Sequence, residues 1–202
     1  MKDLGLLRQG AVLILAGLGL SGCEATTSVP DGTVLDGRPD LPPGYPPKIG
    51  AVTADLNGRG QKWDVYDYSI GAFDAAAQIM GHGGTIEFRL MGQPAGDPDV
   101  RRNRLVLKGA MSDKLATGPL PGALIEIIAG EDWDGLRLSS SGQVVDLVLD
   151  EVSDTGDGVH GHASGHFSAV LCSANGQPIE SNARNCQTIS GTFDTDLQFS
   201  NL

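Results

Sequence analysis

The sequence predicts an all-β fold, an antiparallel β-sandwich or barrel-like domain with one short helix, on the strength of two observations. From residue 49 onward, short apolar segments are separated by Gly, Asp and Pro turns, as in the strands of sandwiches and barrels. Within several segments apolar and polar residues alternate, so that Ile86, Phe88 and Leu90 would share one face of a strand. About 150 residues are enough to bury the core of one domain.

The first 22 residues predict a leader that is removed. A weakly basic start precedes an uncharged apolar run over residues 11–20. That run has the length of a signal-peptide core, about half of the ~20 residues that a membrane-spanning helix needs. It ends in the tetrapeptide Leu20-Ser21-Gly22-Cys23, which resembles the lipobox of bacterial lipoproteins.

The lipoprotein resemblance implies that Cys23 is acylated on its thiol, with chains such as palmitate, and becomes the first residue of the mature protein. Several acyl chains hold a protein on a membrane without a spanning helix. In enteric bacteria an Asp after this cysteine retains the product at the inner membrane, so Glu24 favours the outer membrane. The alternatives are an ordinary cleaved signal peptide and an uncleaved anchor.

Residues 23–48 predict a disordered tether between the lipidated cysteine and a single β domain at 49–202. The tether holds six prolines and almost no apolar pattern. Removing the leader takes away two of 14 basic and one of 25 acidic residues, which leaves a net charge of −12. Such a surface repels phosphate backbones and anionic lipids, so we expect no nucleic-acid partner and membrane contact through the acyl chains alone.

Within the domain we expect antiparallel strands and one helix. The helix is expected at Ala72–Met80, because its apolar residues have helical spacing and Gly81 can cap it. The segment Gln143–Val152 is apolar on both faces, which predicts a central strand. The expected strands are Ala51–Leu56, Lys62–Ser69, Thr85–Met91, Arg104–Gly109, Ala123–Ala129, Gly135–Ser139, Val144–Val152, Val159–Cys172 and Gln187–Phe199.

Two cysteines remain once Cys23 is set aside, and an exported chain is expected to join them. The bond between Cys172 and Cys186 would close a loop for which chain entropy predicts about 3 kcal/mol. The spacing matches no zinc pattern.

The last two expected strands form a hairpin whose register follows from these cysteines. Odd-numbered positions are apolar or small, and even positions are mostly polar. With the two cysteines directly opposite each other, Phe193 faces Gly165 and Phe167 faces Gly191. Each ring would then cover the glycine opposite it.

Histidines on the polar face of this hairpin are the candidate metal ligands. His160 and His162 lie about 6.6 Å apart along a strand, within reach of one ion, and the register brings Asp196 opposite His162. Zinc or another transition metal would suit a His/His/Asp set. His166 is too far along the strand to join, and three solvent-facing histidines are the alternative interpretation.

We therefore expect an envelope lipoprotein, at the outer rather than the inner membrane and facing the periplasm or the cell surface. Its β domain would have a non-catalytic binding or structural role, with an unidentified envelope protein or ligand as partner. The alternatives are a metal-binding domain that uses the His-rich hairpin and a lipocalin-like carrier of a small apolar ligand. Asp154-Thr155-Gly156 matches the tripeptide of pepsin-like proteases, but it occurs once where two are needed, and Asp-Gly is common in turns. We therefore expect no catalytic residues, and no cofactor other than that metal.

Overall fold

The described part of the chain is built from strands. The computed structural model describes residues 46–68, 76–96, 102–129, 137–174 and 186–200, and within these ranges it contains eleven strands and no helix. The all-β prediction is thus confirmed. The strands are β1 (Lys48–Leu56), β2 (Arg59–Tyr66), β3 (Ala77–His82), β4 (Thr85–Pro94), β5 (Arg104–Met111), β6 (Gly118–Pro119), β7 (Leu124–Ile128), β8 (Arg137–Ser139), β9 (Val145–Asp154), β10 (His160–Ala174) and β11 (Cys186–Ser200).

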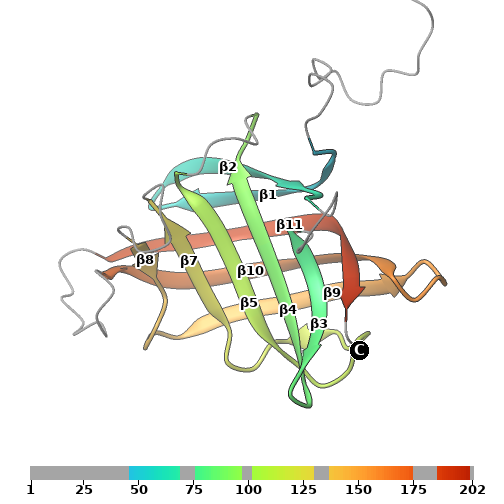
Figure 1. Cartoon of the computed structure of the whole chain (residues 1–202). Coiled ribbons are helices and arrows are strands. Elements are labelled where there is room, and N and C mark those ends of the chain that lie inside the picture. Colours follow the sequence, from blue (N-terminus) through green and yellow to red (C-terminus); the bar gives the residue numbers. More distant parts are fainter. Residues whose placement is uncertain (1–45, 69–75, 97–101, 130–136, 175–185, 201–202) are drawn as a thin grey trace, which may run out of the picture. The chain divides into compact units, whose positions relative to one another are not determined.

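The strands pair into one sheet in the order β2-β1-β11-β3-β4-β5-β7-β8-β10-β9-β6. Because β11 also pairs with β10, the path from β11 through β3, β4, β5, β7 and β8 to β10 returns to β11. In Figure 1, β3, β4, β5 and β7 run steeply across β9, β10 and β11, which lie behind them. The β3–β11 pair is parallel, although we expected antiparallel pairing.

Side chains from the two groups of strands meet in a common core. Phe88 of β4 and Phe193 of β11 stack with their ring centroids 5.5 Å apart. Burying one such side chain contributes about 1.5–3 kcal/mol, so this core is the main source of stability. Other side chains that are almost fully buried are Ile79, Leu90, Leu105, Leu107, Ile125, Leu147, Leu149, Phe167 and Leu171.

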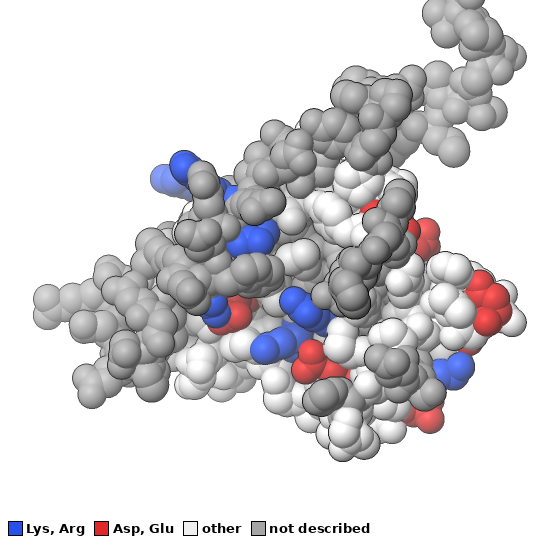
Figure 2. All heavy atoms as spheres, viewed as in Figure 1, with Lys and Arg blue, Asp and Glu red and all other residues white. Residues whose placement is uncertain are grey.

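The outward face of β4, β5 and β7 carries charges of both signs. Figure 2 shows basic and acidic groups close together on this side of the molecule. Outward positions include Arg89 and Lys108, which lie opposite each other on β4 and β5, and Glu126, whose Oε2 is 4.0 Å from a guanidinium nitrogen of Arg137. Surface pairs of this kind, here partly exposed, contribute at most about 1 kcal/mol each.

The predicted helix at Ala72–Met80 is wrong over residues 76–80, because residue 76 is a bend and residues 77–80 belong to β3. Gly83 and Gly84 have φ of 58° and 82° and join His82 to Thr85 in a two-residue hairpin turn. That turn pairs the preceding residues with β4, and Ala77 and Ile79 are buried on alternate positions of β3. The rest of the predicted helix, residues 72–75, lies outside the described residues, as do the leader, Cys23, Glu24 and the tether up to residue 45.

Strand β9 was predicted to be central in the sheet, and this prediction is wrong. It pairs with β10 on one side and, on the other, only with the two-residue β6. Its outward residue Val148 is half-buried, and Val144, just before the strand, is 90% exposed. The short strand β6 had no signal in the sequence, because Gly118 and Pro119 are typical turn residues.

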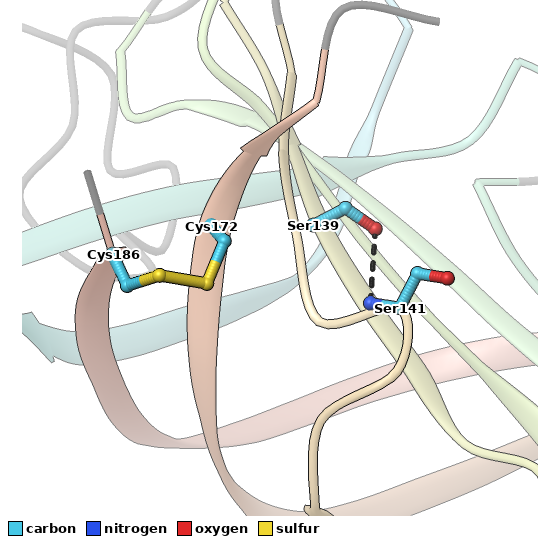
Figure 3. The surroundings of a disulfide bond; sticks show 4 residues. All are labelled: Ser139, Ser141, Cys172 and Cys186. Carbon is cyan, nitrogen blue, oxygen red and sulfur yellow. Dashed lines mark hydrogen bonds between the residues drawn. A yellow bond between two sulfur atoms is a disulfide. The ribbon is translucent and has the colours of Figure 1, made fainter. Parts of the chain in front are cut away.

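The terminal hairpin has the predicted register. Cys172 lies opposite Cys186, and the pairing continues without a shift to His160 opposite Gln198. The two cysteines form a disulfide with an S–S distance of 2.02 Å, next to Ser139 of β8, whose Oγ accepts a hydrogen bond from the Ser141 amide at 3.2 Å (Figure 3).

One of the two predicted ring–glycine contacts, that of Phe193 with Gly165, is present. A Cβ on Gly165 would lie 2.6 Å from the Phe193 ring, as the register predicts. The groups nearest to a Cβ on Gly191 would be the Thr53 carbonyl and the Ala54 side chain, the latter at 2.6 Å, because β1 pairs with this part of β11. The contact of the Phe167 ring with Gly191 stays a prediction. None of the described residues forms a helix long and apolar enough to span a membrane.

Candidate functional site

The candidate site is the outward surface formed by β1, β10 and β11, called here the polar face. Along β10 and β11 the odd-numbered side chains are mostly buried, and the even-numbered ones point outward. Serine, threonine, histidine and aspartate fill most of these outward positions. The alternation predicted from the sequence therefore separates the core from the polar face.

Two histidines at the start of β10 each have a carboxylate partner. His160 Nδ1 lies 2.6 Å from Asp157 Oδ2 in the preceding turn. His162 Nδ1 lies 3.1 Å from Asp196 Oδ1 of β11, as the register predicts, and its Nε2 lies 3.8 Å from Asp194 Oδ2. The hydrogen bond to Asp157 raises the pKa of His160, and the pKa of Asp157 falls far below its usual value for the same reason.

The third histidine, His166, pairs with a carboxylate of β9, which adjoins β10 on the side away from β11. His166 Nδ1 lies 2.9 Å from Asp150 Oδ2 of β9. This hydrogen bond raises the pKa of His166, and the negative charges of Asp150 and Asp146 add to the effect. Each of the three histidines thus has its own carboxylate, from a turn, from β11 and from β9.

The predicted metal ligands do not converge on one point. His162 and Asp196 lie together, but the ring of His160 is hydrogen-bonded to Asp157 in the turn. Within the described ranges no group of three His, Cys, Asp or Glu side chains is arranged to hold an ion. The metal site on His160, His162 and Asp196 stays a prediction.

The protease-like tripeptide forms a turn. Asp154 Oδ1 accepts hydrogen bonds from the amides of Gly156 and Gly158 at 2.7 and 3.3 Å, and both glycines have positive φ. Lys114 Nζ lies 3.2 Å from Asp154 Oδ2. The Gly156 amide, and next the Lys114 side chain, hold the pKa of Asp154 below its usual value. The carboxylate therefore organises the β9–β10 turn, as its Asp-Gly content indicates.

Two hollows lie on the polar face. The first, of about 490 Å³, extends over β2, β1 and β11, and the second, of about 400 Å³, extends over β1, β11, β10 and β9. Both are lined by Thr53 and Thr192, whose hydroxyls lie 3.3 Å apart. The first hollow is also lined by Lys62 and Asp55, and the second by two carboxylates and Ser164.

Comparisons of the chain with protein-family models, with curated proteins and with solved structures found no match.

A buried polar cluster beside β2 had no signal in the sequence. Asp64 is 8% exposed, forms an ion pair with Lys48, and accepts hydrogen bonds from the Tyr66 hydroxyl at 3.3 Å and the Gly96 amide at 2.9 Å. Burial alone would raise the pKa of Asp64, but Lys48, Gly96 and Tyr66 together hold it below its usual value. These donors satisfy a buried carboxylate, so the cluster joins β1, β2 and the turn that follows β4 and has a structural role.

Proposed function

We propose that this chain is a lipid-anchored envelope protein whose β domain binds a ligand or partner protein through the polar face, without catalysing a reaction. The observation that carries the proposal is the pair of hollows that meet at Thr53 and Thr192. Two adjoining shallow hollows that share two hydroxyl side chains and include carboxylates in their linings are more typical of a recognition surface than of an even, solvated sheet.

Recognition at the polar face would use side chains rather than backbone. Strand β11 lies between β1 and β10, β1 lies between β11 and β2, and β10 lies between β11 and β9. Their backbone amides and carbonyls are therefore largely used within the sheet, and a partner cannot add a strand there. Hydroxyls, carboxylates and imidazoles of the outward positions would make the contacts.

The lipobox motif and the cysteine chemistry support an envelope location. Leu20-Ser21-Gly22-Cys23 supplies the acylation signal, and a disulfide between Cys172 and Cys186 suits an oxidising compartment outside the cytoplasm. A tether of about 25 residues would span roughly 25–30 Å on average, and up to about 75 Å as polyproline II. The tether would allow the polar face to reach a partner away from the membrane surface.

We further propose that the strand path closed by the β10–β11 pair is a filled, barrel-like arrangement rather than an open carrier. The stacked rings of Phe88 and Phe193 occupy space that an apolar ligand would need. This packing favours the polar face over the lipocalin-like alternative, in which a ligand enters an interior cavity.

The anchor is tested by replacing Cys23 with Ala in cells that express the full chain. We expect a fatty-acid probe to label the wild-type protein and not C23A, because the lipobox thiol is the acyl acceptor, and we expect C23A to leave the membrane fraction. A C23A protein that still takes up the label would refute the lipoprotein assignment.

The polar face is tested by site-specific photo-crosslinking in the same cells. A crosslinker at Thr192, where the two hollows meet, should yield one discrete adduct. The same probe at the exposed Ser112, which follows β5, should yield none. Equal adducts at both positions, or none at Thr192, would contradict binding at this face.

A further inference from the structure

The hollow of about 400 Å³ has two carboxylates in its lining, those of Asp150 and Asp194. The first of them is hydrogen-bonded to His166, with 2.9 Å between Nδ1 and Oδ2. Both partners are about half exposed, so the imidazole can exchange its proton with solvent. The charge opposite Asp150 therefore depends on one titratable ring.

An irregularity in β9 brings Asp150 to this position. Ser164 of β10 lies opposite Glu151, whereas the next residue, Gly165, lies opposite Leu149, so Asp150 is an extra residue in the ladder. Such a bulge lets two successive residues point the same way. Leu149 remains buried, while Asp150 and Glu151 are both exposed.

The charged groups that β9 and β11, the strands on either side of β10, place near His166 are acidic, and His162 lies two residues before it on the same face of β10 itself. Strand β9 contributes Asp150, Asp146 and Glu151, and Asp194 of β11 lies diagonally across the ladder. The residue directly opposite on β11, Thr192, is neutral. The hydrogen bond to Asp150, together with the negative charges of Asp150 and Asp146, favours the protonated imidazole and holds the pKa of His166 above the ordinary 6.5.

We propose that His166 is a protonation switch that sets the charge of this hollow through Asp150. The inference rests on the proposed binding function of the polar face and assigns its regulation. With His166 protonated, Asp150 has a counter-charge. The other carboxylate of the hollow, Asp194, lies 3.8 Å from Nε2 of His162, a contact that is separate from the His166–Asp150 pair. As the pH rises through the pKa of His166 the counter-charge is lost, and the hollow gains one further negative charge.

The direction of the effect on binding follows from this charge. A cationic group binds the hollow more tightly at higher pH and is released on acidification. Because linkage is reciprocal, a cation bound in the hollow lowers the pKa of His166 by the same free energy by which deprotonation of His166 strengthens cation binding. An exposed pair gives up to about a fivefold change in affinity, the factor that corresponds to about 1 kcal/mol.

The titration is measured by NMR on the full chain in detergent micelles, from the His166 ring between about pH 5.5 and 8.5. In the wild-type protein the midpoint should lie above 6.5. D150N should lower it toward the ordinary value, and D146N should lower it by less. Neither change should move the midpoint of His160, which is paired with Asp157. Equal His166 midpoints in wild type and D150N would overturn the switch.

Binding is measured with putrescine, whose two amines stay protonated over this pH range. Its affinity, followed from the amide signals of Thr192 and Asp194, should rise with pH in the wild-type protein and lose most of that dependence in H166Q. An affinity that is constant with pH, or absent throughout, would overturn the switch. The crosslinking at Thr192 does not depend on either of these measurements. A negative crosslinking result would therefore contradict binding at the polar face, whereas a negative result in the titration or the putrescine measurement would overturn the switch.

Discussion

The glycine at position 165 leaves room for the ring of Phe193 in the core. Gly165 lies opposite Phe193 in the hairpin, and a Cβ at position 165 would lie 2.6 Å from one ring carbon and 2.9 Å from another. The Val148 carbonyl of β9 approaches the same point from the other side. Because β10 is held between two strands here, it cannot move away from one without disturbing the other.

We therefore expect G165A to lower the free energy of unfolding by about 1–3 kcal/mol, the usual cost of overpacking a core. Urea denaturation followed by circular dichroism measures it. The matched control is G60A in strand β2, where a Cβ would have no atom within 4 Å, and where a change within about 0.5 kcal/mol is expected. Equal losses in the two variants would show that close packing at Gly165 is not the cause.

At the scale of strands, the sequence predicts those elements whose evidence lies within a few residues of one another. The β10–β11 register follows from two cysteines and from the alternation of apolar and polar residues, and it is confirmed over the whole hairpin. The sequence does not predict β3, because its residues also fit a helix. Pairing with β4, and with β11, which is distant in sequence, decides between the two structures. The edge-like position of β9 likewise depends on its neighbours and not on its own apolar pattern.

On the polar face, too, the sequence predicts only those contacts whose evidence lies within the hairpin itself. The His162–Asp196 contact follows from the hairpin register and could be predicted. The partner of His166 could not, because Asp150 reaches it through a bulge that no residue pattern marks. The partner of His160 lies three residues before it in an Asp-Gly turn, and the Asp-Gly pattern by itself predicts the turn but not the contact with His160.

The disulfide closes the hairpin at the end where the chain leaves the sheet. Replacing Cys172 and Cys186 together by Ala should lower the free energy of unfolding by about 3 kcal/mol, because the open loop gains entropy in the unfolded state. Chemical denaturation measures the loss, and reducing the wild-type protein should reproduce it. Wild-type protein from the envelope should show no free thiol after denaturation if Cys23 is acylated. Two titratable thiols there would contradict the bond.

At the scale of the whole molecule, the fold depends on contacts between distant parts of the sequence. Strand β11, near the end of the chain, pairs with β1 from the start of the domain, with β3, and with β10. No local pattern specifies these pairings, which form only when the separate apolar faces are buried together. The stack of Phe88 on Phe193 is one point at which the first and last parts of the domain meet.

A double-mutant cycle on this stack measures how strongly the two parts are coupled. F88L and F193L should each lower the free energy of unfolding by about 1–3 kcal/mol. The double variant should lose less than their sum by about 0.5–1.5 kcal/mol, since the ring–ring interaction is removed only once. Pairing F193L with V144T, at a position that is 90% exposed, should give additive losses within about 0.5 kcal/mol. Additive losses in the F88L/F193L pair as well would mean that the rings do not interact across the core, and that burial of each ring alone accounts for its contribution.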